Sequence, residues 1–112
     1  MIVINSFTIM NNSLNPIGQG LYLAASVLDH SCEPNAIWIS NGKELRIRSV
    51  KKIEKFEDLR IAYIPLFDRT KNRRKDLMEA YYFKCKCVRC ADVKSDRLKS
   101  SLLCSNTNCK GM

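Results

Sequence analysis

The sequence predicts a mainly β domain with one helix, an α+β chain that ends in a cysteine-rich segment. Short runs rich in β-branched residues, separated by turn residues, fill the first half of the chain and predict strands. One later segment has apolar residues at i,i+4 spacing, as an amphipathic helix does. Closely spaced cysteines then replace the hydrophobic pattern. The 112 residues, 46% of them hydrophobic, suffice for one small packed domain.

The N-terminal part is predicted to be extended. Residues 2–10 are rich in β-branched residues and predict a strand, and the polar residues 11–15 predict a turn. Pro16 and the two glycines that follow it predict an irregular stretch. The apolar residues 21–28 are too few for periodicity to separate a strand from a buried helix. Residues 29–35 combine polar and turn-forming types and predict a tight loop.

A β-hairpin is predicted in the middle of the chain. Residues 36–40 and 44–50 form its strands, with the turn at Asn41-Gly42, because both of these residue types accept positive φ. Leucine and isoleucine alternate with arginine along the second strand, which predicts one buried and one exposed face. Residues 59–64 predict a further short strand.

Residues 69–83 predict the single helix. Leu77 and Tyr81 are four residues apart, as are Met78 and Tyr82, so each pair shares one helix face. The predicted exposed face carries basic residues: Arg69, Lys71, Arg73, Arg74 and Lys75.

The net charge of +8 fits an acidic or nucleic-acid partner, or a solvated basic surface without a partner. Direct nucleic-acid binding is not expected, because aromatic residues do not alternate with the basic ones. We expect neither a membrane helix nor a signal peptide, since the apolar runs are short. Six cysteines without an export signal indicate a reducing compartment, where they bind metal more often than they form disulfides.

Cys85, Cys87 and Cys90 form a C-x-C-x-x-C cluster. Closely spaced thiolates can wrap one Zn²⁺ ion with little loss of loop entropy, and a tetrahedral site needs a fourth ligand from elsewhere. Three buried thiols without metal are the alternative, which Lys86 and Arg89 disfavour because they indicate exposed backbone.

Cys104 and Cys109 form a separate, looser pair. Their spacing fits half of a second zinc site, and it fits two surface thiols equally well.

The run from Gly20 to Asn35, GLYLAASVLDHSCEPN, resembles the N-H-S-C-x-P-N segment of the SET and MYND-finger (Smyd-type) histone-lysine methyltransferases. The resemblance covers roughly residues 4–92, because further family motifs flank this run in the same order: Asn5-Ser6-Phe7-Thr8-Ile9, Tyr63, Tyr81-Tyr82-Phe83 and the C-x-C-x-x-C cluster. It implies a partial SET-domain β-fold with a zinc-bound post-SET loop. The implied organisation is a C-terminal portion of the SET domain over residues 1–68, a helix and post-SET cluster over 69–92, and a tail over 93–112.

The resemblance also implies a role for individual residues. Cys32 matches the fourth zinc ligand, beside Cys85, Cys87 and Cys90. Asp29, His30 and Phe83 match positions that contact S-adenosylmethionine, and Asp29 stands where the family usually has asparagine. Tyr63 matches the catalytic tyrosine, and Phe7 and Tyr81 match walls of the lysine channel. The glycines of Gly18-Gln19-Gly20 do not match the family's cofactor loop, which lies far upstream of the His30 segment.

The implied activity is methylation of lysine side chains on a histone tail or a non-histone protein, with S-adenosylmethionine and Zn²⁺, in the nucleus and cytoplasm. The isolated chain is expected to be incomplete and weakly active or inactive, because the upstream half of the SET domain has no counterpart in it. The alternative is a catalytically inactive SET remnant that acts as a zinc-stabilised protein-interaction module. Binding of S-adenosylhomocysteine separates the two.

Overall fold

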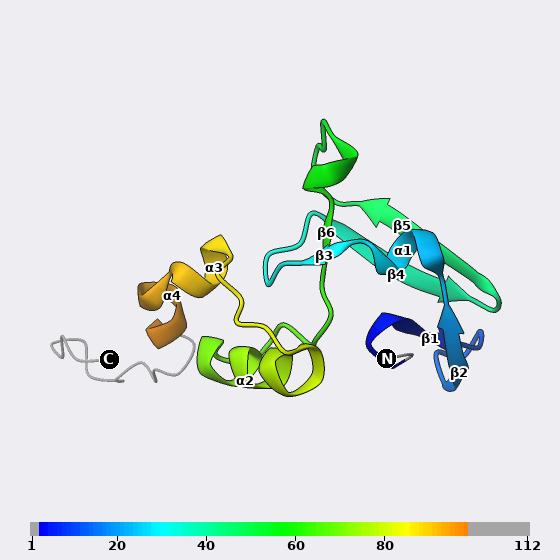
Figure 1. Cartoon of the computed structure of the whole chain (residues 1–112), viewed down its shortest axis with the longest axis horizontal. Coiled ribbons are helices and arrows are strands. Elements are labelled where there is room, and N and C mark those ends of the chain that lie inside the picture. Colours follow the sequence, from blue (N-terminus) through cyan, green and yellow to red (C-terminus); the bar gives the residue numbers. More distant parts are fainter. Residues whose placement is uncertain (1–2, 99–112) are drawn as a thin grey trace, which may run out of the picture. The chain divides into compact units, whose positions relative to one another are not determined.

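The structure is a computed structural model that describes residues 3–98; Cys104 and Cys109 lie outside these residues. The chain divides into two compact units, which we call unit 1 (Met1–Tyr63) and unit 2 (Ile64–Met112). The described part of unit 1 contains paired strands, and that of unit 2 contains helices (Figure 1). Strands with a few helices are consistent with a partial SET fold.

Unit 1 begins with a short 3-10 helix, η1 (Val3–Asn5), followed by the antiparallel strands β1 (Ser6–Met10) and β2 (Pro16–Leu21) (Figure 1). The predicted irregular stretch is therefore wrong, because Pro16 to Leu21 form a strand. Pro16 pairs at the end of the ladder, where a proline is tolerated. A Cβ atom on Gly20 would lie 2.7 Å from Cε2 of Tyr22, so this glycine makes room for the tyrosine ring.

The predicted hairpin is confirmed. Strands β4 (Ala36–Asn41) and β5 (Glu44–Ser49) pair antiparallel. The turn lies one residue later than the Asn-Gly pair suggests, and Gly42 has a φ of +57° at its first position. Arg46 and Arg48 are exposed while the residues between and before them are half-buried, as the alternation predicts.

The segment between the two hairpins is more regular than predicted. A one-turn helix, α1 (Leu23–Ser26), lies within the apolar run that periodicity left open. Strand β3 (Asp29–His30) then pairs in parallel with β6 (Arg60–Ile61), which follows the 3-10 helix η2 (Phe56–Asp58). The predicted tight loop of residues 29–35 is therefore wrong at its first two residues. Pairing to a strand about thirty residues away is a tertiary effect that local composition does not encode.

The core of unit 1 is centred on three buried side chains, Leu28, Ala36 and Ile61. Half-buried residues from each hairpin and from the segments on either side of β6 pack around them, namely Phe7, Trp38, Ile47, Leu59 and Tyr63. The core therefore supports both β3, which carries His30, and the segment after β6 that carries Tyr63.

Unit 2 contains α2 (Thr70–Tyr81), α3 (Val88–Ala91) and α4 (Val93–Leu98). The prediction of one helix is correct for α2 and wrong in number, because α1, α3 and α4 are also helical among residues 3–98. These three span only one or two turns, too few for periodicity to reveal. Asp92 could have indicated the start of α4 from the sequence, because aspartate is a favoured N-cap residue. Its carboxylate accepts the backbone N–H of Ser95 at 3.0 Å.

The predicted exposed face of α2 is partly wrong. Arg73 is 0% exposed and Arg74 is half-buried, whereas the other three basic residues of this face are exposed. The buried positions of the helix are Thr70, Arg73 and Leu77, which the helical period places on one side. The guanidinium of Arg73 is therefore buried, although the sequence pattern predicted that it would be exposed to solvent. None of the helices within residues 3–98 is long and apolar enough to span a membrane.

Tyr82 ends α2 in the left-handed conformation, with φ of 60° and ψ of 30°. Its side chain is 76% exposed and adds little packing. Because an L-residue with a Cβ atom is strained there, Tyr82→Gly is expected to stabilise the protein by about 0.5–1 kcal/mol in thermal or urea unfolding. Tyr82→Ala is the matched control, since it removes the ring but keeps the strain. Equal stability of the two variants would contradict the argument.

Candidate metal centre and active site

His30 links Tyr63 to Cys32 within unit 1. The backbone N–H of Tyr63 donates to Nδ1 of His30 at 3.1 Å, and Nε2 of the same ring lies 3.2 Å from Sγ of Cys32. Because a backbone N–H can only donate, Nδ1 is the acceptor and Nε2 carries the ring proton. The histidine therefore donates to the sulfur of Cys32.

The hydroxyl of Tyr63 is also held in place. It donates to the backbone carbonyl of Leu28, at the edge of the core. The rings of Tyr63 and His30 lie 5.2 Å apart at an interplanar angle of 51°. Ring and hydroxyl are thus both oriented by groups of unit 1.

Asn35 is a positioning residue that sequence reasoning missed. Its side chain accepts the backbone N–H of Arg60 at 2.7 Å and donates to the carbonyl of Asp58 at 2.7 Å. Its own backbone N–H donates to the carbonyl of Arg60 at 3.2 Å. The asparagine thereby ties the end of the D-H-S-C-E-P-N segment to β6, the strand that leads to Tyr63. The position of Asn35 as the last residue of that motif could have indicated this role from the sequence.

Asp29 presents an exposed carboxylate next to His30. An oxygen of this carboxylate lies 3.8 Å from a guanidinium nitrogen of Arg60, its ladder partner in β6. This ion pair is open to solvent, so it holds the carboxylate only weakly. Asp29 therefore remains available to a cationic ligand group.

Phe7 stands among other aromatic rings. It makes edge-to-face contacts with Tyr22 at 6.0 Å and with Trp38 at 5.4 Å between ring centroids. It packs against the same core cluster as Tyr63. Of the predicted site residues, His30 thus contacts both Cys32 and Tyr63, and Phe7 packs against the same core cluster as Tyr63.

The other predicted aromatic residues belong to unit 2. Tyr81 is the last residue of α2 and is half-buried, and desolvation raises the pKa of its phenol above the ordinary value. Phe83 is also half-buried and lies between the end of α2 and the cysteine cluster.

Two of the three clustered cysteines are positioned by the one-turn helix α3. Cys87 is its N-cap residue and Cys90 lies three residues further on, so both are on one side of the turn. Cys85 and Cys90 are buried, and Cys87 is half-buried. Burial raises the pKa of the Cys85 thiol above its ordinary value.

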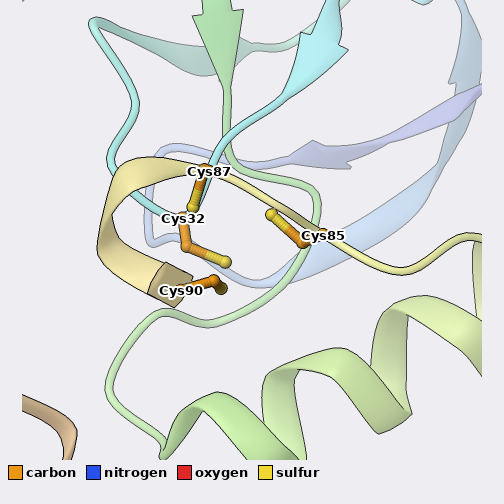
Figure 2. A group of neighbouring side chains, drawn as sticks. All are labelled: Cys32, Cys85, Cys87 and Cys90. Carbon is orange, nitrogen blue, oxygen red and sulfur yellow. The ribbon is translucent and has the colours of Figure 1, made fainter. Parts of the chain in front are cut away.

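Cys32, Cys85, Cys87 and Cys90, which we call the four-cysteine group, have sulfur atoms that all lie within 4.8 Å of one another (Figure 2). A tetrahedral Zn²⁺ ion about 2.3 Å from each sulfur needs sulfur–sulfur distances of about 3.8 Å. The observed spacing is compatible with that geometry, and soft thiolates are the ligands that favour zinc. The group can therefore hold a metal ion.

The SET domain family model matches residues 3–64, more than half of the chain. The chain therefore belongs to the SET-domain family. Its paired strands are consistent with this class.

Within this class the chain is similar to named lysine methyltransferases. It is 41% identical over 95 residues to the histone-lysine N-methyltransferase SMYD3 of Mus musculus, a match that covers 85% of this chain and 22% of that protein. It is 32% identical over 113 residues to the histone-lysine N-methyltransferase ASHR1 of Arabidopsis thaliana, covering 96% of this chain and 24% of the relative. It is also 32% identical over 98 residues to the N-lysine methyltransferase SMYD2-A of Danio rerio, covering 88% and 22%. The chain thus spans less than a quarter of the length of these relatives.

Proposed function

We propose that this chain is part of an S-adenosylmethionine-dependent protein-lysine methyltransferase that acts on histone or non-histone proteins in the nucleus and cytoplasm. Residues 1–68 form the C-terminal portion of its SET domain, 69–92 the helix and post-SET zinc cluster, and 93–112 a tail with a second cysteine pair. The family match over residues 3–64 is the observation that carries the proposal. The names of the relatives support lysine as the methyl acceptor.

Methyl transfer to lysine needs alignment more than strong acids or nucleophiles. When bound, S-adenosylmethionine would supply a methyl group to the neutral lysine amine, with breaking of its carbon–sulfur bond, and the methylated amine would then lose a proton. In this proposal Phe7 and Tyr81 remove water from the substrate lysine, which lowers the pKa of its ammonium group and favours the reactive amine. Tyr63 lies at the point of transfer, and its hydroxyl is fixed by the carbonyl of Leu28.

The chain has side chains suited to this cofactor. The exposed Asp29 carboxylate can accept a cationic group, and the Phe83 ring can pack against an adenine. Both ring nitrogens of His30 already contact Tyr63 and Cys32. His30 would therefore meet the cofactor through its main chain or ring face, and it serves mainly to hold Tyr63 in place.

Zinc has a structural role in this proposal. The four-cysteine group would hold it with four thiolates, which leaves no coordination position for substrate and so fits a structural site. The Nε2–H of His30 would donate to the sulfur of Cys32, as outer hydrogen bonds to metal ligands commonly do. A single chain of contacts would then run from the ion through His30 to Tyr63.

The test is a chimaera in which this chain replaces the matching segment of mouse SMYD3. With methyl-labelled S-adenosylmethionine and histone, we expect methyl transfer that depends on Tyr63. A folded, zinc-loaded chimaera that binds S-adenosylhomocysteine but transfers no methyl group would contradict the catalytic roles given to these residues. Failure to bind S-adenosylhomocysteine would favour the inactive, zinc-stabilised interaction module.

A further inference from the structure

Two consecutive arginines of α2 contact the cysteine cluster of unit 2. Arg73 is completely buried, and one of its terminal nitrogens lies 3.5 Å from Sγ of Cys90. The same nitrogen donates to the hydroxyl of Thr70 at 3.0 Å, and the other terminal nitrogen donates to the carbonyl of Asp68. The guanidinium is therefore held firmly in one orientation against the sulfur.

Arg74 contacts the backbone of the same cluster. Its Nε donates to the carbonyl of Cys85 at 3.0 Å, and a terminal nitrogen donates to the carbonyl of Cys90 at 3.3 Å. One side chain thus joins the first and last cysteines of C-x-C-x-x-C. The planar, forked guanidinium suits such a two-point contact better than an ammonium group does.

We propose that Arg73 and Arg74 are positioning residues for the zinc thiolates, Arg73 through the charge of the site and Arg74 through the shape of the loop. This inference rests on the zinc site proposed above. It assigns to α2 a function that neither the family match nor the names of the relatives provide.

The charge of the site explains why an arginine is buried at this point. A buried cation is costly unless negative charge lies nearby. Three thiolates around one Zn²⁺ ion carry a net charge of −1, and four carry −2. Arg73 stays protonated at any ordinary pH, so its N–H group can offset part of that charge at Cys90.

The decisive variant is Arg73→Met, which keeps an unbranched apolar side chain and removes the charge. Zinc affinity, measured on the full chain by competition with a chromophoric chelator, is expected to fall 10- to 100-fold, the usual cost of losing an outer partner of a metal ligand. Lys75→Met is the matched control: it makes the same change in charge on an exposed residue of the same helix. Its zinc affinity should equal that of the unaltered chain.

Cobalt substitution distinguishes the two arginines. An N–H donor lowers the energy of the sulfur lone pairs, so losing it should move the sulfur-to-Co²⁺ charge-transfer band to longer wavelength. Arg73→Met is expected to show this shift. Arg74→Met, whose partners are carbonyl oxygens, is expected to weaken metal binding without it.

Zinc affinity within threefold of the unaltered chain and an unmoved cobalt band in Arg73→Met would overturn the inference. Should that variant not fold with metal, Arg73→Gln takes its place, because it also removes the charge, and zinc affinity equal to that of the unaltered chain would again overturn the inference. An unaltered chain that binds no zinc would instead refute the zinc site of the proposed function, so the two failures are distinguishable.

Discussion

Cys87→Ser is expected to abolish zinc retention and to unfold the cysteine segment of unit 2. Among the described residues of this unit, Leu77 is the one buried aliphatic side chain; the other buried positions are Thr70, Arg73, Cys85 and Cys90. Such a segment has too little apolar surface to fold on burial alone. Structural zinc contributes an apparent binding free energy of about 10–16 kcal/mol in small zinc domains, so losing one of four ligands should cost a large share of it.

Metal analysis by mass spectrometry, together with thermal unfolding, measures this effect. Cys104 and Cys109 should first be changed to serine, so that the zinc count reports on the four-cysteine group alone. We expect one zinc per chain in this background and none after Cys87→Ser. Unchanged metal content and melting temperature after Cys87→Ser would remove Cys87 from the site.

Tyr63→Phe is expected to lower methyl transfer about 100-fold or more in the active chimaera. The variant keeps the ring against the core but loses the hydroxyl that Leu28 orients, and misalignment or loss of one polar group at a reacting centre commonly costs that much. Zinc content should not change, because the bond between His30 and Tyr63 uses the backbone N–H.

Initial rates with labelled S-adenosylmethionine at saturating substrate measure the effect of Tyr63→Phe. Tyr82→Phe is the control, because it removes the hydroxyl of an exposed tyrosine and should leave the rate unchanged. Retention of more than a third of the activity by Tyr63→Phe would exclude a catalytic role for its hydroxyl.

The features predicted correctly from sequence are those set by local chemistry. Alternation and an Asn-Gly pair predict β4 and β5, because a short turn and a half-buried face depend on neighbouring residues. The spacing of Cys85, Cys87 and Cys90 likewise predicts a group of thiols, and their sulfur atoms lie close enough together, with that of Cys32, to hold a metal ion.

Features that depend on distant partners were missed. From the sequence, the glycines of β2 predict irregular backbone. The structure shows that Gly20 instead leaves space for the ring of Tyr22. From the sequence, Arg73 is expected to be a solvent-exposed basic residue of the helix. Its burial is explained by its contact with Cys90, which is seventeen residues later in the chain. The contacts of Asn35 with β6 are similarly invisible in the local sequence.

Zinc K-edge X-ray absorption on the chain with Cys104 and Cys109 changed to serine tests most directly whether one ion is held by Cys32, Cys85, Cys87 and Cys90. The proposal predicts four sulfur neighbours at about 2.3 Å, falling to three in Cys32→Ser. Fewer than four sulfur neighbours before that substitution, or four that persist after it, would contradict the proposal.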